Sequence, residues 1–399
     1  MGWHSVHVDL HALVKALREE RCNVLESRGT APGASAAEPP KRFCEGQTGN
    51  SMQYRLLGRS GLKVSVFSFG AMTFGGSGMF ATMGSTRGAE ARRHIDMCLE
   101  AGVNLFDTAD IYSAGESEVL LSEALGARRP QVLVATKFMG KTGKGANDLG
   151  ASRLHIISAC EASLKRLNTD YIDLYQPHNQ DLITPPEETL RALDDLVRAG
   201  KVRYIGSSNH AGWTQMRALA TSDRLGLTRY VSQQIQYSLL QRSAENELLP
   251  LGVHEGVGAL IWSPLASGYL TGKFRTTADA DKTRLGARGL LAAMDNERAR
   301  RIVGVLEEIA RSCAGRTPSQ AALNWLARKP GVSSIIVGAR TAEQLKDNLG
   351  ASTWSLTDAE IAALDQASAV PPVYPYNMHY EYMADRNPIA PLQAPIVDK

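Results

Sequence analysis

The stretch that decides the fold runs from Thr184 to Gly206 and reads TPPEETLRALDDLVRAGKVRYIG. Its apolar residues recur with helical spacing, at Leu190, Leu193, Leu196 and Val197. This periodicity predicts an amphipathic helix. A capping box from Thr184 to Glu187, with proline in the first turn, begins the helix, and Gly200 ends it. Lys201–Gly206 follows as a short strand. The stretch is therefore one helix-to-strand unit.

The same unit recurs along the chain. Short β-like runs lie near residues 66, 103, 132, 171, 202, 230, 257 and 333, and nearly every gap between them has a helical pattern. Alternating strands and helices predict a parallel sheet covered by helices. Eight units are the number in a (β/α)8 TIM barrel. A doubly wound sheet is the alternative, but Gly70–Gly78 lacks the G-x-G-x-x-G spacing and no helix pattern begins directly after it.

The two ends of this repeat carry additional elements. Gln53–Leu57 and Leu62–Val66 flank the turn Gly58–Gly61, which predicts an N-terminal β-hairpin. A capping box at Thr357 predicts a C-terminal helix, and a tail follows it. We expect residues 52–399 to form a single barrel domain. Residues 1–51 differ, because their segment Gly29–Lys41 is rich in proline and small residues, so we expect a disordered or dispensable extension.

Composition excludes several classes of protein. The chain has 399 residues, 43% of them hydrophobic, and a net charge of only +3, which argues against disorder and against nucleic-acid binding. It has no apolar run long enough to insert into a membrane. The 5 cysteines lack paired spacing, and Cys98, Cys160 and Cys313 resemble small core residues. We expect a cytoplasmic protein, either a monomer or a homo-oligomer.

Ionisable residues end three successive predicted strands. Asp107 follows the strand near 103, Lys137 the strand near 132 and His178 the strand near 171, while Tyr112 lies in the loop after Asp107. In a (β/α)8 barrel the active site lies at these strand ends. Taken singly, Asp107 could cap a helix, Lys137 could be a solvated charge and His178 a rim histidine. Their occurrence on three consecutive strands instead indicates an active site.

Longer motifs around these residues resemble the aldo-keto reductase superfamily. They are listed here in chain order: Asn104–Tyr112 (NLFDTADIY) with Gly115–Glu118, Ala135–Lys137, Tyr175–His178, Gly206–Asn209, Trp262–Lys273 and Gly338–Asn348. The resemblance runs from about Tyr54 to Leu364. It is similar to bacterial branches near the potassium-channel β-subunits rather than to the mammalian aldose-reductase branch.

The resemblance implies hydride transfer between a nicotinamide and a carbonyl carbon, with four catalytic residues. Tyr112 matches the acid that protonates the forming alkoxide. A free phenol titrates near ~10, so a nearby cation is needed to lower its pKa. Lys137 can supply that charge, and Asp107 can hold the ammonium. His178 can orient the carbonyl and share in proton transfer.

The resemblance also assigns a cofactor site and implies NADP(H). The matching positions are Ser208, Asn209 and Gln234 for the carboxamide, Trp262 for stacking, Ser263, Leu265, Ser267, Gly268 and Lys273 for the pyrophosphate strap, and Gly338, Arg340, Gln344 and Asn348 for the adenosine end. Arg340 directly precedes a predicted helix start, where it can grip a 2′-phosphate. Arg284 is either a further phosphate contact or a surface charge.

The substrate is a small carbonyl compound or alcohol whose identity the motifs leave open, from sugars to xenobiotics. Loop residues that could wall its pocket are Met72, Phe74, Phe138, Asn179 and Trp213, although ordinary loop packing explains each equally well.

Two other functions compete with a reductase. One is a regulatory subunit that binds NADP(H) and signals redox state to a partner. The other is a metal-dependent barrel hydrolase or isomerase, but only His178 among the histidines ends a strand, so a ligand cluster is lacking.

We expect a chain that begins at Met52 to fold and to keep its activity, because the barrel motifs start after this residue. Circular dichroism and NADPH-dependent turnover, compared with those of the full chain, test this. Loss of either in the shortened chain would show that residues 1–51 belong to the working protein.

Overall fold

A computed structural model describes residues 52–273, 291–312 and 315–381. Eight parallel strands close into a barrel in the order β10-β3-β4-β5-β6-β7-β8-β9. Their bounds are β3 Phe67–Gly70, β4 Leu105–Asp107, β5 Leu133–Phe138, β6 Ile172–Pro177, β7 Val202–Ser208, β8 Ser232–Gln236, β9 Gly258–Trp262 and β10 Val332–Val337. The eight predicted strands and the TIM-barrel architecture are confirmed.

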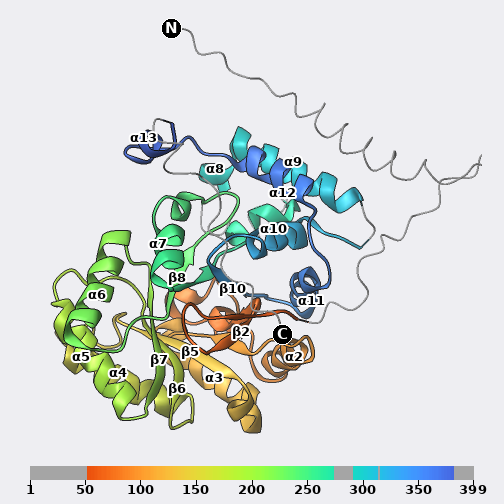
Figure 1. Ribbon diagram of the computed structural model, residues 1–399. Helices are drawn as coiled ribbons and strands as arrows, with labels where there is room; N and C mark the ends of the chain where they lie inside the picture. Colours follow the sequence, from red (N-terminus) through yellow and green to blue (C-terminus); the bar gives the residue numbers. More distant parts are fainter. Residues whose placement is uncertain (1–51, 274–290, 313–314, 382–399) are drawn as a thin grey trace, which may run out of the picture.

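Helices surround the strands (Figure 1). In chain order they are α2 Gly88–Glu100, α3 Glu116–Leu125, α4 Arg153–Arg166, α5 Pro186–Arg198, α6 Gly212–Leu225, α7 Leu248–Glu255, α8 Leu291–Met294, α9 Glu297–Ser312, α10 Pro318–Ala327, α11 Ala342–Gly350, α12 Asp358–Ser368 and α13 Tyr376–Glu381. The predicted capping box at Thr357 is present at the start of α12. The one predicted at Thr184 is wrong: Pro185 occupies the N-cap of α5, and the Thr184 hydroxyl donates to Asp181 instead.

The predicted N-terminal hairpin pairs β1 (Tyr54–Leu56) with β2 (Lys63–Ser65) in antiparallel register. Its Leu57 and Val64 are fully buried in one cluster with barrel residues such as Leu105 and Leu174. At the turn, Gly58 has φ +60°, and a Cβ there would lie 2.4 Å from the carbonyl oxygen of Gly256. The hairpin therefore closes the apolar end of the barrel by an approach that only glycine permits.

The barrel interior changes from apolar to polar along β4 and β5. Leu105 precedes Asp107 by two residues on β4, and Ala135 precedes Lys137 by two residues on β5. Because side chains in a strand alternate between faces, each polar residue shares the inward face with its apolar neighbour. The apolar members belong to the cluster that contains the hairpin. The polar members therefore lie at the opposite, carboxyl end, where barrel active sites form.

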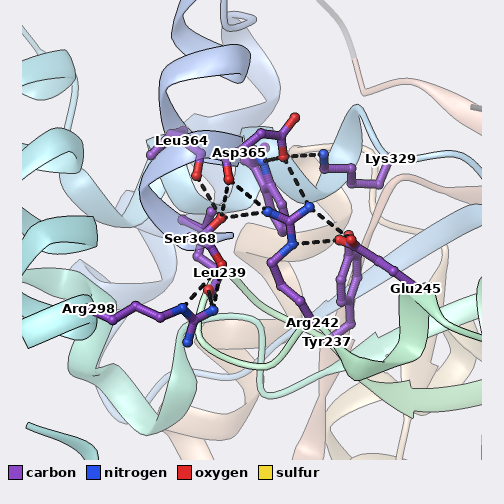
Figure 2. Close-up of polar contacts among 10 residues, drawn as sticks. Tyr237, Leu239, Arg242, Glu245, Arg298, Lys329, Leu364, Asp365 and Ser368 are labelled. Carbon is purple, nitrogen blue, oxygen red and sulfur yellow. Dashed lines mark hydrogen bonds and ion pairs between the residues drawn. The ribbon is translucent and has the colours of Figure 1, made fainter. Parts of the chain in front are cut away.

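A polar network, here called the clasp, joins the segment after β8 to three C-terminal helices (Figure 2). Arg242 donates to both oxygens of Glu245 at 2.8 Å and to the Ser368 hydroxyl at 2.9 Å. Asp365 accepts from Lys329 at 2.5 Å. Arg298 donates to the carbonyl oxygens of Leu239 and Ser368. Trp325 on α10 also donates from Nε1 to Asp365 at 3.0 Å, so the clasp joins α9, α10 and α12 to the segment after β8.

Other predictions concern cysteines and the chain ends. Cys98 and Cys160 are buried, and burial raises the pKa of the Cys160 thiol to about 12, as expected of core residues. Cys313 and residues 1–51 lie outside the described residues. In the part of the chain that the structure describes, no helix has the length and apolarity to span a bilayer.

We expect Arg242→Met to lower the free energy of unfolding by about 2 kcal/mol, because it removes the ion pair with Glu245 and the hydrogen bond to the Ser368 hydroxyl. Arg300→Met is the matched control, since Arg300 pairs with Asp295 on the surface, where such pairs contribute less than about 1 kcal/mol. Urea unfolding of both variants measures the difference. Equal midpoints would contradict a stabilising role for the clasp.

Candidate active site

Lys137 is the centre of the site. Its side chain is completely buried, and its ammonium donates to Asp107 Oδ1 at 2.5 Å, to the carbonyl oxygen of Thr108 at 2.8 Å and to the Tyr112 hydroxyl at 3.4 Å. Burial opposes the charge, but Asp107 and Tyr112 outweigh it and raise the pKa of Lys137 above its usual value. The ammonium is therefore charged at neutral pH and is bonded to three oxygens.

Asp107 is fixed by a second bond that crosses the barrel. Its Oδ2 accepts from Gln234 Nε2 at 2.7 Å. Gln234 lies on β8, which is four strands away from β4 in the eight-strand order and hence opposite to it. Both carboxylate oxygens of Asp107 are thus occupied, and the carboxylate cannot turn away from Lys137.

Tyr112 opens a short 3-10 helix, η3 (Tyr112–Gly115), and is only 8% exposed. Its ring packs edge-on against Phe80 and His178, with centroids 5.2 and 5.5 Å away. Burial is the largest influence on its pKa and raises it above 10; the Lys137 charge lowers it and Asp107 raises it again. Lys137 therefore lowers the pKa of the phenol as predicted, but burial outweighs this effect and the net pKa is raised.

His178 follows β6. Its main-chain N–H donates to the carbonyl oxygen of Phe138 at 2.8 Å, and its own carbonyl oxygen accepts from Asn209 Nδ2 at 3.0 Å. Burial, and then the Lys137 charge, lower the pKa of the imidazole to about 3. The ring is therefore neutral at physiological pH. Its Nδ1 has no hydrogen-bond partner among the described residues.

The residues predicted to bind the carboxamide and to stack on the nicotinamide lie together beside Asp107, Tyr112, Lys137 and His178, here called the tetrad. Ser208 ends β7 and donates to the carbonyl oxygen of Gln234 at 3.1 Å. Asn209 has φ +54°, a conformation costly for a residue other than glycine. Its Oδ1 accepts from Trp262 Nε1 at 3.0 Å, so the amide also orients the indole. The hydrogen bonds of Asn209 to Trp262 and of Gln234 to Asp107 were not predicted.

The predicted pyrophosphate strap follows β9 and contains the 3-10 helix η6 (Ala266–Thr271). Five of its residues have positive φ: Ser263, Ala266, Ser267, Gly268 and Gly272. Such left-handed backbone is rare outside glycine and concentrates at ligand-binding loops. Leu265 precedes η6, Lys273 is exposed at the end of the strap, and Arg284 lies outside the described residues.

The residues predicted for the adenosine end lie between β10 and α11. Arg340 is exposed, and its main-chain N–H donates to Gln344 Oε1 at 3.0 Å. Asn348 Nδ2 donates to the carbonyl oxygen of Gly338 at 3.4 Å. Thr341 caps α11, so the Arg340 side chain emerges beside a helix N-terminus, where anions bind favourably.

The residues predicted to wall the substrate pocket separate into two groups. Phe74 and Phe138 are fully buried in the core between strands and helices, Phe74 against Phe69 and Phe138 against Tyr175. For these two the prediction is wrong; for Phe138 the reason is strand alternation, because Lys137 points inward and its neighbour must point outward. Met72 is half-buried against the cluster of Phe80, Met83, Ala109 and Tyr112. Asn179 and Trp213 are exposed.

Besides the Gln234 bond to Asp107, two further contacts of the tetrad were missed from the sequence. Phe80 packs on Tyr112 from a loop with no periodicity, and Thr108 acts through its main-chain carbonyl, which carries no residue signature. Within the described ranges, no group of three or more His, Cys, Asp or Glu side chains is placed to hold a metal ion.

Comparison with known proteins agrees with the fold. Residues 67–369 match the model of the aldo/keto reductase family. A probable voltage-gated potassium channel subunit beta of Arabidopsis thaliana is 37% identical over 75% of this chain and 91% of its own length. The uncharacterized oxidoreductase YrpG of Bacillus subtilis is 38% identical over 78% of this chain and 94% of its own. With a barrel of this topology and family motifs over most of its length, the chain belongs to the aldo/keto reductase family of oxidoreductases.

Proposed function

We propose that this protein reduces the carbonyl group of an aldehyde or ketone to an alcohol, reversibly, with NADPH as the hydride donor and Tyr112 as the general acid. The observation that carries the proposal is the buried chain from Asp107 through Lys137 to the Tyr112 hydroxyl. A charge buried this deeply is costly. Its placement beside a phenol supports a role in proton transfer.

Carbonyl reduction needs a proton at the oxygen as the hydride reaches the carbon. When bound, NADPH would supply the hydride, and the Tyr112 hydroxyl would supply the proton. Lys137 lies 3.4 Å from that hydroxyl and would stabilise the phenolate that remains. Asp107, held from two sides, keeps the ammonium in place. In alcohol oxidation the same phenolate would accept the proton.

His178 would position the carbonyl rather than protonate it. Its ring lies edge-on to Tyr112, and its low pKa leaves it uncharged. A neutral imidazole can donate one hydrogen bond to a carbonyl oxygen. Of the two roles expected for His178, orienting the carbonyl and sharing in proton transfer, we therefore propose only the first.

The described residues fit a nicotinamide dinucleotide. Hydroxyl and amide groups of Ser208, Asn209 and Gln234 gather beside the Trp262 indole, a donor and acceptor set suited to a carboxamide and an aromatic ring. Because Gln234 Nε2 is used by Asp107, its Oε1 is the atom left to accept from a carboxamide. The strained strap and Arg340 would hold the phosphates.

The substrate pocket is proposed on the Tyr112 side of Met72 and Phe80, with Trp213 and Asn179 nearer to solvent. These walls are mainly apolar, which suits a carbonyl on a hydrophobic or mixed body, such as a xenobiotic or a sugar derivative. A cytoplasmic location would supply the reduced cofactor.

A second function is a redox-sensing regulatory subunit that binds NADP(H). The observation that favours it is the similarity to proteins described as probable or putative potassium channel β-subunits. Tight NADPH binding without turnover, together with a membrane partner that co-purifies, would support this function over the reductase.

We expect Tyr112→Phe to lower kcat for carbonyl reduction by at least about 100-fold, because the acid is removed while the ring packing stays. NADPH binding, followed by fluorescence, should be unchanged. Absorbance of NADPH with a panel of aldehydes, diketones, sugars and keto compounds measures turnover. Tyr230→Phe is the control, because Tyr230 is equally buried but lies on the approach to β8 rather than beside Lys137. Turnover that survives in Tyr112→Phe would refute the assignment.

We expect the His178 ring to show no titration between pH 5 and 8 in ¹H–¹⁵N NMR spectra, because its pKa in the folded chain is about 3. In the unfolded chain the imidazole takes up a proton near pH ~6.5. Its burial therefore reduces stability as the pH falls from there toward 3. His178→Gln identifies the resonance, and a midpoint near 6.5 in the native protein would contradict a neutral positioning role.

We expect Arg340→Ala to raise the Michaelis constant for NADPH about tenfold or more and to leave that for NADH nearly unchanged, because only NADPH carries a 2′-phosphate. Steady-state kinetics with both cofactors measures the ratio. Arg328→Ala, which removes a surface arginine paired with Asp358, should change neither. Equal effects on both cofactors would exclude the 2′-phosphate role of Arg340.

A further inference from the structure

Asp110 is a buried carboxyl group that the proposed reaction does not use. It lies two residues before Tyr112, is 3% exposed, and its main-chain N–H donates to the carbonyl oxygen of Lys137 at 3.1 Å. Among the described residues, neither of its carboxyl oxygens has a hydrogen-bond partner of standard geometry. Buried polar groups are nearly always hydrogen-bonded, so this arrangement calls for an explanation.

The cations near Asp110 are already bound to other carboxylates. Lys137 is paired with Asp107. Arg166 on α4 donates to Glu118 Oε2 at 2.6 Å, and Thr136 donates to Glu118 Oε1 at 2.5 Å. The Glu118 side chain, on α3, is fully buried. The arginine is thus bonded to Glu118 and not to Asp110, and two neighbouring buried carboxyl groups do not both ionise readily.

Burial and the neighbouring Glu118 carboxylate favour the neutral form of Asp110. Burial first, and then Glu118, raise the pKa of Asp110 to about 8, although Arg166, the Ile111 main-chain N–H and Lys137 oppose the shift. The other titratable groups that feel its charge are Tyr112 on η3 and Tyr175 on β6, and an ionised Asp110 raises the pKa of both phenols.

We propose that Asp110 is a positioning residue that holds a proton near neutral pH and, on losing it in alkaline solution, keeps the Tyr112 phenol protonated. This inference rests on the proposed role of Tyr112 as the acid. Asp110 becomes negatively charged only in alkaline solution, where the Tyr112 hydroxyl would otherwise begin to lose its proton. The consequence is a reductase whose acid remains available at higher pH.

Holding this proton reduces the stability of the fold. An unfolded aspartate ionises near pH ~3.9, whereas Asp110 in the folded chain stays neutral to about pH 8. Folding therefore takes up a proton between these values, and stability falls as the pH rises through that window. A buried group that costs stability and lies beside a catalytic acid is expected to serve function.

Asp110→Asn tests the proton directly, because an amide of the same shape cannot ionise. Thermal unfolding at pH 5 and pH 8 measures the stability of the variant relative to that of the native chain. This relative stability should be greater at pH 8 than at pH 5. We expect a relative gain of at least about tenfold in the folding equilibrium constant, or about 2–4 °C in Tm. A gap between variant and native chain that does not grow from pH 5 to pH 8 would overturn the proposal.

Asp194→Asn is the matched control. Asp194 is also buried, but it accepts hydrogen bonds from Arg198 and Thr228, and its pKa is lowered despite the opposing effect of burial. Its ionised form stabilises the fold above the unfolded pKa. The Asn variant should therefore lose stability at pH 8, the opposite of Asp110→Asn.

The pH profile of carbonyl reduction tests the effect on Tyr112. Asp110→Asn should move the alkaline limb of kcat to lower pH while the KM for the carbonyl changes less than about twofold. A merely structural residue would leave that limb in place, and an unmoved limb would refute the link to Tyr112. If the native chain has no turnover, the proposed function fails, while the unfolding experiment still decides whether Asp110 holds a proton.

Infrared spectra of the native chain test for the proton on Asp110 without any substitution, so this test holds even if Asp110→Asn does not fold. With ¹³C-labelled aspartate, a protonated buried carboxyl should give a labelled C=O band at pH 6 that disappears with a midpoint near pH 8. Absence of such a band at pH 6 would overturn the proposal.

Discussion

The buried ion pair between Lys137 and Asp107 is the constraint on which the rest of the structure depends. An ammonium inside a barrel costs several kcal/mol unless its partners are placed accurately. Here the carboxylate comes from one strand and the ammonium from the next, and a carbonyl oxygen from the intervening turn completes the set. Gln234 fixes the carboxylate from the opposite strand. The Gln234 bond to Asp107 therefore depends on the closed barrel, because an open sheet has no opposite strand.

The barrel separates the tasks of stability and chemistry along its axis. At one end the hairpin and inward leucines form an apolar plug, and at the other the inward positions are charged or polar. The strain concentrates at the polar end, where Asn209 and the strap after β9 adopt left-handed backbone. Rigid strands below and strained loops above are a common way to hold reactive groups in position.

The similarity to both channel β-subunits and a bacterial oxidoreductase is consistent with one barrel serving different roles. Family membership therefore does not by itself decide between turnover and sensing. The geometry that bears on this choice is local: a phenol, an ammonium and a neutral imidazole within contact of one another.

The sequence alone determined the strand count, the barrel and the three ionisable residues at the strand ends, because periodicity and residue order are local properties of the chain. The tertiary structure decided what depends on distant residues. Burial raised the pKa of Tyr112 against the expected effect of Lys137, and it made His178 neutral. Strand alternation placed Phe138 in the core, and Gln234 met Asp107 across the barrel. Desolvation and contacts between residues more than 100 positions apart arise only when the barrel closes, so no reading of the motif could supply them.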